Sequence, residues 1–134
     1  MSYLLDVNAL MALGVLQHVF HQRVADWLKR IAREEPWELL TCSVTELGFV
    51  RVLGQTPQYG LTVPQAKDLL MGLKASGGLR LRFIVDDHEI SRLPSWVKLP
   101  NQTTDGHLLE LARANGAVLA SLDQGIPGAM LIPL

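Results

Sequence analysis

Apolar and polar positions alternate with two different periods along the chain, and this pattern predicts short strands separated by helices. Apolar runs that end at a polar or turn residue predict strands at 4–5, 37–42, 79–85 and 117–122, and a short run at 130–132 would add a fifth. Apolar residues three or four apart predict helices over 8–16, 18–35, 43–53, 62–75, 86–93 and 104–114. Strands that alternate with helices in this way indicate an α/β fold with a central, mostly parallel sheet of four to five strands.

Local signals assign faces and ends to three of these helices. The helix over 18–35 has an apolar face and ends before Pro36; that face comprises Val19, Phe20, Val24, Trp27, Leu28 and Ile31. In the helix over 43–53, Leu47, Val50 and Leu53 are expected to face the core. Thr62 and Gln65 have the spacing of a capping box, with Pro64 in the first turn, so a helix should begin there.

Composition places the chain among single-domain globular proteins. It has 134 residues, 49% of them hydrophobic, which is enough for one sizeable core over residues 1–134. The longest apolar run, 9–16, is too short to span a membrane, and no basic segment precedes an apolar one as in a signal peptide. Cys42 is the only cysteine, which excludes an internal disulfide and favours a reducing compartment. We therefore expect a soluble, cytoplasmic protein.

Net charge argues against a general nucleic-acid binder, because 12 Lys and Arg residues face 13 Asp and Glu residues. The balance changes if some of the acids bind metal ions, since the basic residues then outnumber the remaining acids. A nucleic-acid substrate is therefore compatible with the composition.

Four acids lie where the expected strands end or the expected helices begin. Asp6 ends the first strand, and Asp123 ends the fourth. Glu46 lies in the first turn after the second strand, and Asp105 lies in the first turn of the helix before the fourth. The carboxyl ends of parallel strands share one edge of a sheet, which should bring Asp6, Glu46 and Asp123 together. Asp105 would join them only if the loop before it crosses over the sheet.

Each acid also has a purely structural interpretation. Asp6 would cap a helix, Glu46 would complete a capping box with Ser43, Asp105 would favour the positive end of its helix, and Asp123 would form a turn. Taken together, four such coincidences at one edge favour a single site. Two carboxylates about 4 Å apart repel by about 4 kcal/mol at an effective dielectric constant of 20, so such a cluster requires cations or raised pKa values. Mg²⁺ binds carboxylate oxygens, and such a site suits phosphodiester hydrolysis.

The ordered set of polar motifs resembles the PIN-domain family, and in particular the VapC-type toxins of bacterial toxin–antitoxin pairs. The matching segments are 4–8 (LLDVN), 43–47 (SVTEL) with Arg51, 104–108 (TDGHL) and 121–123 (SLD). Their order and the chain length match the family over essentially the whole sequence. The resemblance implies a PIN-like α/β/α sandwich and an endoribonuclease that depends on Mg²⁺ or Mn²⁺. It also implies a homodimer and a cognate antitoxin whose C-terminal segment covers the site.

By position, the resemblance makes Asp6, Glu46, Asp105 and Asp123 the catalytic, metal-binding quartet, with Asn8 and Ser121 as supporting polar residues. The family often carries a basic residue shortly before the third acid, whereas this chain reads LPNQT at 99–103. Arg51 or Lys98 would then contact the RNA instead, and Trp96, in the same loop, is a candidate for stacking on a base.

Three other interpretations compete with this one. His18 and His21 have a spacing that can hold a metal ion, but no third nitrogen or sulfur ligand is near them in the sequence, so we expect both at the surface. A phosphatase with Asp6 as nucleophile generally uses a second acid two residues on, where this chain has Asn8. A non-catalytic interaction module on the same scaffold remains an alternative that metal-binding and RNA-cleavage assays would separate.

Overall fold

The computed structural model describes residues 1–134 and contains one sheet of five parallel strands. The strands are β1 (Ser2–Leu5), β2 (Glu38–Thr41), β3 (Leu81–Phe83), β4 (Val118–Ser121) and β5 (Met130–Leu131). Their order in the sheet is β3-β2-β1-β4-β5. Strands β2 and β3 therefore lie on one side of β1, and β4 and β5 lie on the other. The predicted α/β class and the parallel sheet are confirmed, including the fifth strand.

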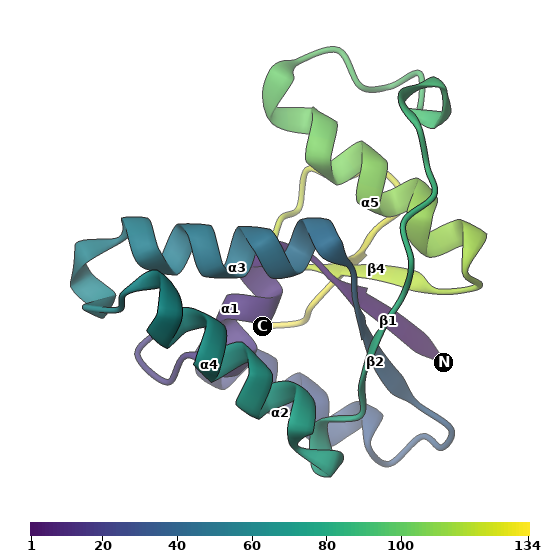
Figure 1. The fold of residues 1–134 in the computed structure, drawn as a ribbon. Helices are drawn as coiled ribbons and strands as arrows, with labels where there is room; N and C mark the ends of the chain where they lie inside the picture. Colours follow the sequence, from purple (N-terminus) through teal and green to yellow (C-terminus); the bar gives the residue numbers. More distant parts are fainter.

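Helices cover both faces of this sheet, as Figure 1 shows. They are α1 (Val7–Gly14), α2 (His21–Ile31), α3 (Ser43–Gln55), α4 (Val63–Ala75) and α5 (Thr103–Ala114), with short 3-10 turns η1 (Pro57–Tyr59), η2 (Gly77–Leu79), η3 (Ile90–Arg92) and η4 (Pro100–Gln102). Side chains of α1 to α4 share one core cluster with Leu5 and Leu39 of the sheet. Those of α5 share a second with Leu4 and Leu40, which point the opposite way because side chains alternate along a strand. The fold is an α/β/α sandwich.

Register within the sheet decides which residues reach its carboxyl edge. Leu5 of β1 lies opposite Ala120 of β4, and Thr41 of β2 lies opposite Phe83 of β3. The next residues along β1 and β4 therefore emerge at the same edge, and α3 begins there after β2.

The second helix is shorter than its apolar pattern predicts. Helix α2 begins at His21, and Val19, expected in its core face, is 82% exposed. Val24, Trp27 and Ile31 are buried as predicted. The expectation that His18 lies at the surface is also wrong, because its side chain is 7% exposed and both of its ring nitrogens have hydrogen-bond partners.

The core face of α3 is rotated relative to the prediction. Leu47 is 71% exposed, whereas Gly48 and Phe49 are buried. A Cβ on Gly48 would lie 2.4 Å from Val7 Cγ2, so a side chain here would separate α3 from α1. The predicted capping box of Ser43 and Glu46 is wrong: Cys42 is the N-cap, and its N–H donates to Thr45 Oγ1 at 3.0 Å.

The sequence predicts a helix over 86–93 in the segment before α5, and this prediction is wrong. It is an extended loop with the single turn η3, and β3 ends at Phe83 rather than at 85. Asp86 accounts for the difference, because its carboxylate accepts the N–H of His88 and pairs with the His107 ring of α5. The capping box at Thr62 is confirmed, with the Gln65 N–H donating to Thr62 Oγ1 at 3.2 Å.

Candidate active site

Three of the predicted acids line one cavity at the carboxyl edge of the sheet. Its volume is about 260 Å³, and its lining residues are Asp6, Val7, Asn8, Thr104, Asp105, Leu108 and Asp123. They come from the β1–α1 junction, the first turns of α5 and the residue pair that follows β4. Residues separated by more than a hundred positions thus meet at the point where two neighbouring strands end.

Asp6 is the most constrained of the three acids. Its side chain is 7% exposed; Oδ1 accepts the Ala9 N–H at 2.8 Å and caps α1, while Oδ2 accepts the Ser121 hydroxyl. Burial raises the pKa of Asp6, Asp123 raises it further, and the hydrogen bonds from Ser121 and Ala9 oppose this rise. The helix-capping interpretation and the site interpretation are both compatible with this geometry.

Ser121 connects Asp6 to the third acid. Its Oγ donates to Asp6 and accepts the Asp123 N–H at 2.9 Å. Asp123 is exposed, and its Oδ1 accepts the Gly125 N–H at 2.8 Å in the predicted turn, so its other oxygen has no partner in the chain. The buried hydroxyl of Ser121 therefore fixes the relative positions of both acids.

Asp105 reaches the cavity because the preceding loop packs closely on α5. A Cβ on Gly106 would lie 2.4 Å from Val97 Cγ2, so the loop passes directly over the first turn of the helix. The Asp105 carboxylate accepts no hydrogen bond from the chain. Burial, reinforced by the charges of Asp6 and Asp123, raises its pKa to about 6. The loop before Asp105 thus takes the path that this acid needs in order to join Asp6 and Asp123.

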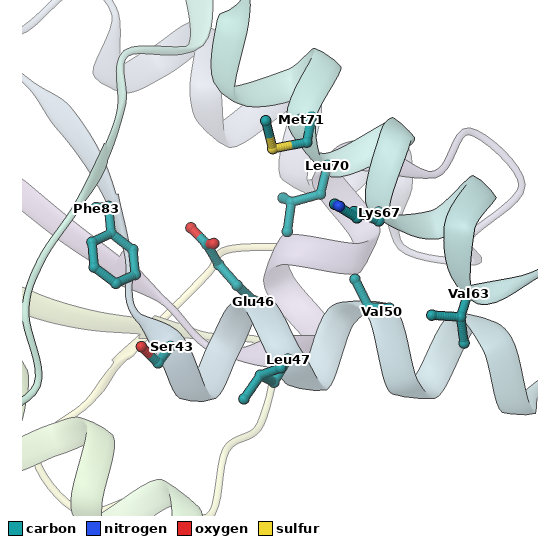
Figure 2. A pocket seen from close by; sticks show the side chains of 9 residues that line it. All are labelled: Ser43, Glu46, Leu47, Val50, Val63, Lys67, Leu70, Met71 and Phe83. Carbon is teal, nitrogen blue, oxygen red and sulfur yellow. The ribbon is translucent and has the colours of Figure 1, made fainter.

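Glu46 does not line this cavity. Its Oε2 accepts the Thr41 hydroxyl at 2.6 Å and the Lys74 ammonium at 2.7 Å, which leaves the charge paired. Figure 2 shows Glu46 rising from α3 into a second cavity, of about 500 Å³, between α3 and α4. That cavity is lined by Ser43, Glu46, Leu47, Val50, Val63, Lys67, Leu70, Met71 and Phe83. The structure therefore brings Asp6, Asp105 and Asp123 together and places Glu46 in a separate cavity, paired with its own cation.

Lys74 is a residue that the sequence analysis missed. It lies in the last turn of α4, and its Nζ also lies 5.3 Å from the centroid of the Phe83 ring. A cation in the last turn of a helix is favourable in itself, so its position gave no sign of a link to Glu46, 28 residues away.

The donor chemistry of the cavity fits a hard divalent cation. Three carboxylates repel one another there, Asp105 has no partner, and Mg²⁺ and Mn²⁺ take oxygen ligands. In the present side-chain positions, no three Asp, Glu, His or Cys side chains are close enough together to hold one ion. Side-chain rotation of Asp105 and Asp123 would therefore have to complete such a site.

The residues expected to contact RNA lie outside both cavities. Arg51 and Lys98 are exposed and form no ion pair. Trp96 is half-buried and packs against the core cluster on the α5 side of the sheet. Its contacts favour a packing role over stacking on a base.

Comparisons with known proteins decide the family. No family model matches the chain. Ribonuclease VapC38 of Mycobacterium tuberculosis is 40% identical over 129 residues, which cover 92% of this chain and 86% of the relative. The chain belongs to the VapC ribonuclease family. Ribonuclease VapC44 of the same species is 37% identical over 96% of this chain and 94% of its own length.

Two solved structures show that the fold is that of VapC proteins. The VapBC2 structure from Rickettsia felis, bound to a DNA fragment from its promoter, superposes with a TM-score of 0.65 and 16% identity, covering 98% of this chain and 97% of that one. VapC20 of M. tuberculosis, a toxin that cleaves the sarcin–ricin loop, superposes with a TM-score of 0.61 and 12% identity, covering 98% of both chains. The predicted PIN-like sandwich is confirmed. None of the helices is long and apolar enough to cross a membrane.

Proposed function

We propose that this VapC-family chain is the toxin of a toxin–antitoxin pair and cleaves RNA phosphodiester bonds within the strand, using Mg²⁺ or Mn²⁺ held by Asp6, Asp105 and Asp123. The observation that carries the proposal is the cavity in which these three carboxylates meet, with the pKa of Asp105 raised to about 6 by burial and by the other two charges. Membership of a family of ribonucleases supports RNA as the substrate.

Residues of the chain prepare this cavity before any ion binds. The Ser121 hydroxyl and the Ala9 N–H orient the Asp6 carboxylate, while Asp105 keeps both oxygens free of partners in the chain. When bound, a divalent ion would activate water and shield the charge of the leaving oxygen. Asn8 lines the same cavity and supplies a polar group at its rim. Pairing of its Oε2 with Lys74 and Thr41 would weaken any contribution of Glu46 to ion binding.

An antitoxin partner and a homodimer belong to the same proposal. The VapBC2 structure supports a cognate antitoxin by analogy. The second cavity supports a protein partner, because the exposed apolar side chains of Leu47, Val63 and Met71 line it beside Glu46. Light scattering on the purified chain, alone and with the antitoxin encoded beside it, would measure both associations.

RNA cleavage by the purified chain tests the enzymatic proposal. A labelled single-stranded or hairpin RNA should be cut internally with Mg²⁺ or Mn²⁺, and EDTA should stop the reaction. Asp6→Asn removes one charge at nearly constant volume and should lower the rate at least about a hundredfold, as expected for loss of a group that stabilises the transition state. Asp68→Asn, at an exposed position without a hydrogen bond or ion pair, is the matched control and should keep full activity. Wild-type rates in Asp6→Asn, or in EDTA, would refute the site.

A further inference from the structure

One buried histidine lies directly behind the candidate active site. His18 lies in the connection between α1 and α2, and its Nε2 is 2.8 Å from Oδ1 of Asn8, a residue that lines the cavity of the three acids. Its Nδ1 is 3.0 Å from the backbone nitrogen of Phe20. A polar side chain in so enclosed a place, with both nitrogens engaged, is strongly oriented.

The backbone N–H of Phe20 determines which ring nitrogen of His18 carries the proton. A backbone N–H can only donate, so Nδ1 of His18 must accept from Phe20 and carries no proton. In the neutral ring the proton is then on Nε2, which must donate to Asn8. Burial, followed by the neighbouring His21, lowers the pKa of His18, and this agrees with a neutral ring.

This tautomer determines which way the amide of Asn8 points. The atom that accepts from Nε2 must be the amide oxygen, because the NH₂ group has no lone pair to offer. Oδ1 is therefore turned toward His18, and the NH₂ group, which has no partner in the chain, is the polar atom left for the cavity. We propose that His18 is a positioning residue that holds the Asn8 amide with its NH₂ group available to the Asp6–Asp105–Asp123 cavity. Asn8 then acts as a hydrogen-bond donor to an anionic or water oxygen and does not ligate a metal ion through Oδ1.

The structural part of this inference stands without any activity, whereas its catalytic consequence rests on the proposed ribonuclease function. A phosphate oxygen of RNA and a water molecule share the acceptor chemistry that the amide would meet. Loss of His18 would free the amide to rotate, so Asn8 would present its oxygen or its NH₂ group at random. Among acids that already repel one another, the oxygen would be the unfavourable choice for an anionic substrate.

A double-mutant cycle measures whether His18 acts through Asn8. His18→Phe removes both hydrogen bonds while keeping a planar ring, and it should lower kcat about tenfold through lost orientation, with little change in KM. In an Asn8→Ala background the same change should have less than about a twofold further effect, because interacting residues are not additive. His21→Phe is the matched control: its ring contacts the Ala12 carbonyl at 2.7 Å and not Asn8, so it should leave kcat unchanged. Equal losses from His18→Phe in both backgrounds would overturn the inference.

A second measurement needs neither a variant nor substrate. Long-range ¹H–¹⁵N correlation spectra of the wild-type chain at pH 7 identify the tautomer of each histidine, and His18 should be neutral with its proton on Nε2. A proton on Nδ1, or a charged ring, would overturn the inference even if RNA is cleaved. The expected tautomer in a chain that cleaves no RNA would instead refute only the proposed function. The spectra also decide the matter if His18→Phe fails to fold.

Discussion

Replacing Asp105 with Asn should make the metal-free protein more stable at neutral pH. Burial, together with the charges of Asp6 and Asp123, raises the pKa of Asp105 from 3.8 to about 6. A carboxyl group whose pKa is higher in the folded state contributes its full stability below its unfolded pKa, and this contribution is lost as pH rises through the folded pKa of about 6. At pH 7.5 the wild-type protein therefore carries the full cost of this charge, and Asp105→Asn removes it.

The structure sets the size of the effect. The rise in the pKa of Asp105 corresponds to about 3 kcal/mol in full. Because the carboxylate is only half-buried, solvent screening reduces this to about 1–2 kcal/mol. The variant also loses the attraction of a carboxylate to the N-terminus of α5, about 0.5 kcal/mol. A net gain of about 1 kcal/mol remains, which raises Tm by about 3 °C for a chain of this size.

Thermal melts in EDTA across pH 4 to 8 would measure this gain. The variant should melt higher at pH 7.5, and the difference should shrink as pH falls toward 4, where Asp105 of the wild type is protonated in the folded state and increasingly protonated in the unfolded state. Added Mn²⁺ should stabilise the wild type more than the variant, because a bound ion stabilises only the state that holds it. Asp68→Asn controls for the loss of one negative charge. A variant that melts lower in EDTA and gains as much from Mn²⁺ would show that Asp105 is a helix-start residue and no part of the site.

Three further changes test the surroundings of the cavity. Glu46→Gln keeps the acceptor for Thr41 but loses the ion pair with Lys74. The variant should lower the free energy of unfolding by less than about 1 kcal/mol in a denaturant titration. Unchanged RNA cleavage by this variant would exclude Glu46 from the site. Lys74→Met keeps the apolar stem near Phe83 and leaves Glu46 without its ion-pair partner. Calorimetry should then show that the variant binds Mn²⁺ more tightly than the wild type. Equal affinity would mean that the Lys74–Glu46 ion pair does not compete with the metal ion. Gly48→Val should destabilise the fold by about 2 kcal/mol or more in urea unfolding, because its side chain would overpack against Val7. Gly54→Val is the control, since its side chain meets only Val63 at the edge of the α3–α4 cavity. Wild-type stability in Gly48→Val would contradict the close approach of α1 and α3.

Local pattern was sufficient for most elements of the fold and failed where tertiary contact overrides it. Leu4 and Leu5 are buried on opposite faces of the sheet, so their strand follows from an apolar run. Val19 has the same apolar character but continues no helix, because the chain turns back there around the buried ring of His18. On α3 the sequence favoured the large Leu47 as a core residue, yet the helix meets α1 through Gly48. How closely two helices approach depends on the residues of both helices, whereas the periodicity of one segment describes only one of them.

The charge distribution of the site could likewise be predicted only in part from the sequence. The positions of Asp6 and Asp123 follow from topology alone, since Asp6 directly follows β1 and Asp123 lies two residues after the neighbouring strand β4. The pairing of Glu46 does not, because it depends on how far α4 extends past α3. The capping box at Thr62 fixes the start of α4, and the thirteen residues from Val63 to Ala75 bring Lys74 back to the level of Glu46. The length of α4 therefore decides whether Glu46 is paired with a cation of the chain, and a change of one turn in α4 would remove Lys74 from this position.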